Sequence, residues 1–90
     1  MPERRVTVAS SVGLHARPAA IFAQKAAAQP VPVKLAKPGG EPVDARSILL
    51  VLSLDVRGGQ EVVLSAEGDG ADSALDSLTE LLSRDLDKEA

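Results

Sequence analysis

Apolar and polar residues alternate along three stretches of the chain, as expected for β-strands that have one buried face. These stretches are residues 4–9, 31–37 and 60–66. Period-two alternation over such lengths predicts a strand in each stretch. The turn signal Pro38-Gly39-Gly40 follows the second stretch, and residues 41–44 are expected to return as a short strand that completes a hairpin.

Two other segments repeat their apolar residues at helical spacing. The first runs from Ala16 to Ala28, and its Pro18 fits only in the first turn of a helix, where the missing N–H has no partner to lose. The second begins after Asp69, which is predicted as its N-cap. Its apolar stripe consists of Ala71, Ala74, Leu75, Leu78, Leu81 and Leu82.

The segment RSILLVLSLDV fits a buried strand or a short helix equally well, because periodicity cannot separate the two at this length. The order of the other strands and helices predicts an α+β fold, with antiparallel strands and the helices packed on one face of the sheet. A chain of 90 residues without an evident linker predicts a single domain, residues 1–90.

Composition excludes several classes of function. The chain has no cysteine and one histidine, His15, which excludes disulfides, thiol catalysis and zinc sites built from several histidines or thiolates. Phe22 is the only aromatic residue, and single-stranded nucleic-acid binding usually stacks bases on aromatic side chains. The longest apolar runs have five residues, too few for a membrane span, and no signal-peptide segment is evident. We therefore expect a cytoplasmic protein with no metal, cofactor, nucleic acid or membrane insertion.

Charge is distributed unevenly along the chain. Residues 1–46 carry seven basic and three acidic side chains, whereas residues 47–90 carry three basic and ten acidic ones. The acidic half solvates the last helix and its flanks. The basic half predicts a positive surface around Arg17 and Lys25 that meets an acidic partner or a phosphate group.

His15 lies where a loop that contains Gly13 meets the first predicted helix. The N–H groups at a helix N-terminus lack partners within the helix and attract anions, phosphate in particular. A neutral imidazole at this end is a nucleophile, and a phosphoryl group on it would bring its negative charge close to those N–H groups and to Arg17. The pattern indicates a phosphoryl acceptor; the plainer interpretation is a surface histidine or a helix cap.

Two interpretations from other classes compete with a phosphoryl carrier. One is a small regulatory or ligand-binding domain, without catalysis, in which His15 merely caps the helix. The other is a hydrolase, since the serines and the aspartate that a triad needs are present at Ser10, Ser11, Ser47 and Asp44. Nothing in their spacing favours a triad, and a hydrolase of this size without an evident pocket would be unusual.

Two motifs resemble one known family. The segment GLHARPAAIFA resembles the active-site segment of the HPr family, the histidine-containing phosphocarriers of the bacterial phosphoenolpyruvate-dependent sugar phosphotransferase system. The segment VDARSILLVLSL resembles the stretch around that family's regulatory serine. The resemblance extends from about Arg4 to Leu86. It implies an open-faced sandwich of four antiparallel strands and three helices in the order β-α-β-β-α-β-α, with a short helix over Ser47–Leu52.

The resemblance also implies roles for individual residues. His15 matches the phosphoryl acceptor, which reacts through Nδ1 in the family, and Arg17 matches the neighbour that stabilises the charge. Ser47 matches a serine that a dedicated kinase phosphorylates in some bacteria. Its alternative is a plain helix cap. The residues that match the partner-contact surface are Ala16, Ala20, Lys25, Ile48, Leu49 and Leu52.

The sequence departs from the family pattern in two places near Ser47. Leu50 stands where the family often has glycine, and Arg46 stands where lysine is frequent. A short amphipathic helix buries one side only, and Leu50 and Leu54 are the residues expected to point inward. Ile48, Leu49 and Leu52 are then expected to be partly exposed and to contact partner proteins.

The implied activity is that of a phosphoryl carrier, not an enzyme. The implied donor is the first enzyme of the phosphotransferase system, charged by phosphoenolpyruvate, and the implied acceptors are the IIA domains of sugar permeases. A serine kinase/phosphorylase is a further implied partner, and a monomer is expected. The alternative within the family is a related carrier that serves a regulatory, nitrogen-related or fructose-type branch.

Overall fold

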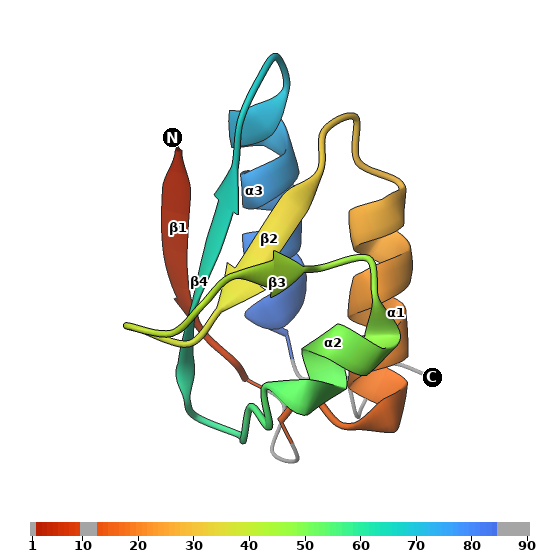
Figure 1. Ribbon diagram of the computed structural model, residues 1–90, viewed down its shortest axis with the longest axis vertical. Helices are drawn as coiled ribbons and strands as arrows, with labels where there is room; N and C mark the ends of the chain where they lie inside the picture. Colours follow the sequence, from red (N-terminus) through yellow and green to blue (C-terminus); the bar gives the residue numbers. More distant parts are fainter. Residues whose placement is uncertain (1, 10–12, 85–90) are drawn as a thin grey trace.

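Four antiparallel strands form one sheet, and three helices pack against it (Figure 1). The computed structural model describes residues 2–9 and 13–84. The elements are, in chain order, β1 (Glu3–Thr7), α1 (Ala16–Ala27), β2 (Val33–Ala36), β3 (Val43–Asp44), α2 (Ile48–Ser53), β4 (Glu61–Ala66) and α3 (Ala71–Leu82). The open-faced sandwich and its β-α-β-β-α-β-α order are confirmed. Ser10 and Ser11, two members of the suggested triad, lie outside the described residues, as does Leu86.

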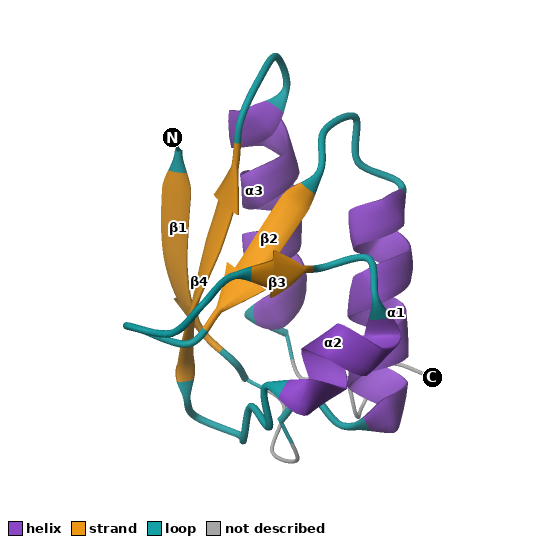
Figure 2. Cartoon of the chain, viewed as in Figure 1, coloured by secondary structure: helices purple, strands orange, loops and turns teal. Residues whose placement is uncertain are grey.

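The strands lie in the order β1-β4-β2-β3, and every pair is antiparallel. β4 is central: Val62 lies opposite Val6 of β1, and Leu64 lies opposite Leu35 of β2. These four side chains are buried because they fall on the same face of the pleat, as the period-two alternation predicted. Figure 2 shows the sheet in front of α3, with α1 and α2 beside each other at one flank.

The helices bury the apolar stripes that the sequence predicted. In α1 the only aromatic residue, Phe22, is fully buried together with Ala19. In α3 the stripe residues Ala71, Ala74, Leu75, Leu78 and Leu82 are buried, and Leu81 is partly buried against the core. Small alanines on α1 let this helix pack closely beside α2 and α3, so a core of Val, Leu and Ala is filled with a single aromatic ring.

The predicted N-cap of the last helix is wrong. Gly70, not Asp69, is the N-cap of α3, and it has a left-handed backbone with φ +93°. Gly68 also has a positive φ, so the chain turns tightly through both glycines and leaves Asp69 exposed in the turn. A Cβ at position 70 would lie 3.0 Å from Cγ of Pro30. The turn before α3 therefore depends on glycine and not on a capping side chain.

The second helix spans Ile48–Ser53, one residue later than predicted, and Ser47 is its N-cap. The prediction that Leu50 points inward is wrong, because Val51 is fully buried while 42% of Leu50 is exposed. A helix of six residues makes less than two turns, so few of its side chains can point fully into the core, and Val51 is the buried one. Leu54, the other residue expected inward, packs partly against the core, and Leu52 does the same.

The loop before α1 rests on the segment that precedes β4. The N–H of Leu14 donates to the carbonyl of Val56 at 2.9 Å, and both residues are buried. Gly13 has φ +72°, and a Cβ there would lie 2.2 Å from the Val56 carbonyl oxygen and 2.6 Å from Cα of Arg57. Position 13 therefore requires glycine for two separate reasons, its backbone conformation and the close approach of another backbone.

We predict that Gly13→Ala destabilises the protein by about 2–5 kcal/mol, since left-handed strain of about 1–2 kcal/mol adds to overpacking of about 1–3 kcal/mol. The matched control is Gly39→Ala. Gly39 has a similar φ of +78°, but nothing lies within 4 Å of its Cβ position, so only the strain of about 1–2 kcal/mol applies. Urea unfolding of the two variants measures the difference, and equal losses would contradict the close packing of Gly13 on Val56.

Candidate phosphoryl-acceptor site

His15 is exposed and is the N-cap residue of α1. Its backbone is extended, with φ −81° and ψ −172°, and its carbonyl accepts from the N–H of Ala19 at 2.8 Å. The imidazole makes no capping hydrogen bond. His15 therefore occupies the N-cap position, as the plainer interpretation expected, but its side chain does not take part in capping.

The first turn of α1 is arranged to receive an anion. Its second residue is the exposed Arg17, its third is Pro18, and it contains no acidic side chain. Because proline has no N–H, the backbone donors at the start of this turn are the N–H groups of Ala16 and Arg17, which point out of the end of the helix. Negative charge at this end is stabilised by those groups and by the helix dipole, typically by about 0.3–1 kcal/mol at an exposed site.

An apolar surface lies on α2, the helix that packs beside α1 (Figure 1). Its side chains are Ile48, Leu49 and Leu50, which are 41%, 79% and 42% exposed. They are the large hydrophobic residues exposed among those the structure describes. We call these three residues the α2 apolar patch. Exposed apolar side chains grouped in this way are a common feature of surfaces that contact other proteins.

Sequence reasoning predicted two of the three patch residues. Ile48 and Leu49 are exposed as expected, whereas Leu50 was expected in the core and belongs to the patch instead. Leu52 is half-buried and is held against the core, so its contribution to the exposed surface is smaller. Ala16 is exposed and Ala20 is half-buried in the first two turns of α1.

Asp44 and Arg46 form a tight ion pair directly before Ser47. Oδ1 of Asp44 accepts from the Arg46 backbone N–H at 2.9 Å and from Nε at 3.1 Å, while Oδ2 accepts from the guanidinium at 3.0 Å. The hydrogen bond from the Arg46 side chain and then that from its backbone N–H lower the pKa of Asp44, and the carboxylate raises the pKa of Arg46. Since the Asp44 pKa is lowered on folding, the pair stabilises the fold above the ordinary carboxyl range. That contribution disappears as the pH falls through the lowered pKa.

The same contacts weigh against the hydrolase interpretation. The carboxylate of Asp44 is occupied by Arg46, and Oγ of Ser47 accepts from the N–H of Leu50 at 3.3 Å as the cap of α2. Ser47 therefore acts as a helix cap in the structure, as one of its two interpretations predicted.

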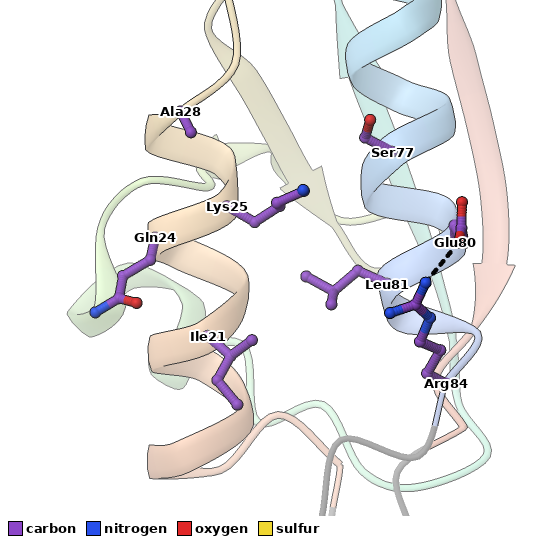
Figure 3. A pocket seen from close by; sticks show the side chains of 8 residues that line it. All are labelled: Ile21, Gln24, Lys25, Ala28, Ser77, Glu80, Leu81 and Arg84. Atoms are coloured by element: carbon purple, nitrogen blue, oxygen red, sulfur yellow. Dashed lines mark hydrogen bonds and ion pairs between the residues drawn. The ribbon is translucent and has the colours of Figure 1, made fainter. Parts of the chain in front are cut away.

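Lys25 lies on the flank of α1 that faces α3 (Figure 3). There it lines a groove of about 410 Å³ between the two helices, together with Ile21 and Leu81. Across the groove Arg84 donates to Glu80 at 2.6 Å. Lys25, which the resemblance assigned to the partner-contact surface, therefore faces α3 and not α2.

Sequence reasoning missed the support beneath the histidine loop. Val56 ends the segment that fitted a strand or a short helix, and nothing in the sequence pattern predicted that Val56 and Arg57 lie against Gly13. The Gly58-Gly59 pair was the available signal, because paired glycines mark a tight turn that can approach another backbone closely.

The described residues contain neither a cluster of metal ligands nor a membrane-spanning helix. No group of three or more His, Cys, Asp or Glu side chains in residues 2–9 and 13–84 could hold a metal ion. No helix within the same part of the chain is long and apolar enough to cross a membrane.

Comparison with known proteins gives a consistent result. A family described as "PTS HPr component phosphorylation site" matches residues 2–84. The phosphocarrier protein HPr of Streptomyces coelicolor is 49% identical over 88 residues, which are 98% of this chain and 95% of the relative. The HPr-like protein Crh of Bacillus subtilis is 42% identical over 78 residues, 87% of this chain and 91% of the relative. A crystal structure of HPr from Thermoanaerobacter tengcongensis superposes with a TM-score of 0.89 at 37% identity and covers all of both chains.

The matched residues 2–84 contain both motifs on which the resemblance rested, the segment around His15 and the segment around Ser47. The relatives are matched over nearly their full length, so membership of one family explains both the fold and the phosphocarrier role. The chain belongs to the HPr family of phosphocarrier proteins of the phosphotransferase system, which carry a phosphoryl group and are not themselves enzymes.

Proposed function

We propose that His15 accepts the phosphoryl group from the phosphoenolpyruvate-charged first enzyme of the sugar phosphotransferase system and donates it to IIA domains of sugar permeases. The observation that carries the proposal is the exposed imidazole at the N-terminus of α1, which makes no capping bond and has the α2 apolar patch on the neighbouring helix. A nucleophile, an anion-binding helix end and a docking surface therefore occupy one region of the molecule.

The transfer is a displacement at phosphorus between two imidazoles. The lone pair on Nδ1 of His15 forms a new N–P bond as the N–P bond to the donor histidine breaks, and the donor keeps that electron pair. The three remaining phosphoryl oxygens then carry about two negative charges on His15. In the second step His15 is the donor and passes the group to an acceptor in the same way, so His15 ends each cycle unmodified.

Arg17 and the first turn of α1 stabilise the charge that arrives. A guanidinium in a charge-assisted hydrogen bond with an anionic oxygen contributes on the order of 1.5–3 kcal/mol. The N–H groups of Ala16 and Arg17 add the interaction of the helix N-terminus. This stabilisation must stay modest, because a carrier that held its phosphoryl group too tightly would not release it to the next protein.

The α2 apolar patch is proposed as the centre of docking for donor and acceptor. Its three exposed side chains supply apolar area that becomes buried on contact, while the exposed Arg17 in the first turn of α1 supplies positive charge for an acidic partner. A patch of this size favours short-lived complexes, as a carrier that alternates between partners requires.

Ser47 remains a predicted site of regulatory phosphorylation. A phosphate on Oγ would lie at the start of α2, where negative charge is favourable for the helix. It would also place about two negative charges next to Ile48 and Leu49, where an acidic partner approaches. The expected effect is weaker docking of an intact fold.

Incubation with phosphoenolpyruvate and the first enzyme of the system, followed by intact mass measurement, tests the proposed function. We expect the wild-type protein to gain one acid-labile phosphoryl group and His15→Ala to gain none. His15→Ala should keep its unfolding midpoint, because the side chain is exposed. Equal labelling of both proteins would place the acceptor elsewhere, and no labelling of the wild type would overturn the proposal.

We predict that Leu49→Glu weakens binding to the first enzyme at least tenfold with little change in stability. Leu49 is the most exposed residue of the α2 apolar patch, and a carboxylate there removes apolar contact and repels an acidic partner. The matched control is Ser73→Glu, which adds the same charge at an exposed position of α3. Titration calorimetry of both variants measures the effect. Equal affinities for the two variants would contradict docking through the patch, and unfolding of Leu49→Glu would show that the residue is structural.

A further inference from the structure

Gln60 closes the turn from Arg57 to Gln60 with one backbone and one side-chain hydrogen bond. The N–H of Gln60 donates to the Arg57 carbonyl at 3.1 Å, and Oε1 of Gln60 accepts from the Arg57 N–H at 2.9 Å. Gln60 therefore binds both backbone groups of the same residue. Gly59, with φ +82°, supplies the left-handed backbone that the turn needs between them.

The turn is also fixed to the sheet on its other side. The carbonyl of Gln60 accepts from the N–H of Val8 at 2.9 Å, and the N–H of Gly59 donates to the carbonyl of Val8 at 3.0 Å. Val8 therefore bonds to both Gln60 and Gly59, directly beyond the last paired residues of β1 and β4, Thr7 and Glu61. Backbone hydrogen bonds thus fix the end of the turn nearest β4. The Arg57 N–H at the other end is held by its hydrogen bond to Oε1 of Gln60.

The fixed end of the turn supports the loop that carries His15. The carbonyl of Val56, whose carbon is bonded to the Arg57 nitrogen, accepts from the N–H of Leu14 at 2.9 Å. The Val56–Arg57 backbone also lies against Gly13 so closely that a Cβ would not fit. Orientation of the 56–57 peptide therefore sets the position of Leu14, the residue directly before His15.

We propose that Gln60 is a positioning residue for the phosphoryl acceptor. Its Oε1 fixes the N–H of the 56–57 peptide, and the carbonyl of that same peptide holds Leu14. The two hydrogen bonds lie on opposite edges of one planar amide group, so loss of the first lets the plane tilt and misdirects the second. The inference rests on the proposed function of His15 for its effect on transfer, but not for its effect on Leu14.

The exposure of Gln60 distinguishes this positioning role from a structural role in the core. Gln60 and Arg57 are both exposed, so removal of the Gln60 amide is not expected to leave an unpaired polar group in the core. One neutral hydrogen bond changes a local opening equilibrium by a factor of about two to ten. The expected loss of global stability is therefore small, whereas the precision of the His15 loop is affected directly.

The test compares Gln60→Leu, which removes the acceptor, with Gln60→Glu, which keeps an oxygen at the same place. We expect Gln60→Leu to raise the hydrogen-exchange rate of the Leu14 amide about fivefold and to lower the maximal rate of phosphoryl transfer from the first enzyme by a similar factor. The donor concentration at half-maximal rate and the unfolding midpoint should stay unchanged. Gln60→Glu should restore both rates toward the wild-type values.

Gln29→Leu is the matched control, since Nε2 of Gln29 donates to the Lys25 carbonyl at 3.0 Å at the far end of α1. It should change neither rate. Wild-type exchange of Leu14 in Gln60→Leu would overturn the inference, as would slower transfer without faster Leu14 exchange. If the wild type accepts no phosphoryl group, the proposed function fails, and the Leu14 exchange rates still decide the positioning role.

Discussion

The hydrogen bond from the Leu14 N–H to the Val56 carbonyl is the contact on which the arrangement of the site depends. It joins the loop before α1 to the segment before β4, two parts of the chain that no strand pairing connects directly. Gly13 allows this bond, because any side chain at that position would collide with the Val56 carbonyl. The start of α1, and with it His15, is therefore placed relative to the sheet by backbone contacts that do not depend on the exposed side chains.

This arrangement suits a group that must be charged and discharged repeatedly. The proposed acceptor side chain is at the surface, while the residues that hold its loop are buried: Leu14 and Val56 are both almost fully covered. In the proposed function, the positive end of α1 and Arg17 would meet the phosphoryl charge without any acidic residue in the first turn to oppose it. The proposal assigns partner contact to a different element, α2, so that binding strength and phosphoryl stabilisation could be set independently.

Sequence patterns predicted most of the fold because its strands and long helices have strict periodicities. Alternation identified β1, β2 and β4 to within a few residues, and the alanine-rich segment placed the start of α1 at Ala16. The errors occurred where tertiary contacts decide. Leu50 and Val51 are both apolar, and only the packing of α2 on the core determines which one is buried. Asp69 has the side chain of an N-cap, but the turn geometry places Gly70 there. The support of Gly13 by Val56 links residues more than forty positions apart, which no local pattern reveals.

If His15 is the acceptor, the N-terminus of α1 receives the phosphoryl charge on a framework that does not rearrange. Two-dimensional ¹H–¹⁵N NMR of the protein before and after phosphorylation tests this. We expect large downfield shifts of the Ala16 and Arg17 amides, which would donate to the phosphoryl oxygens, and little change at Val33 and Leu64 in the sheet. Unshifted amides at the start of α1, or shifts spread through the sheet, would contradict it.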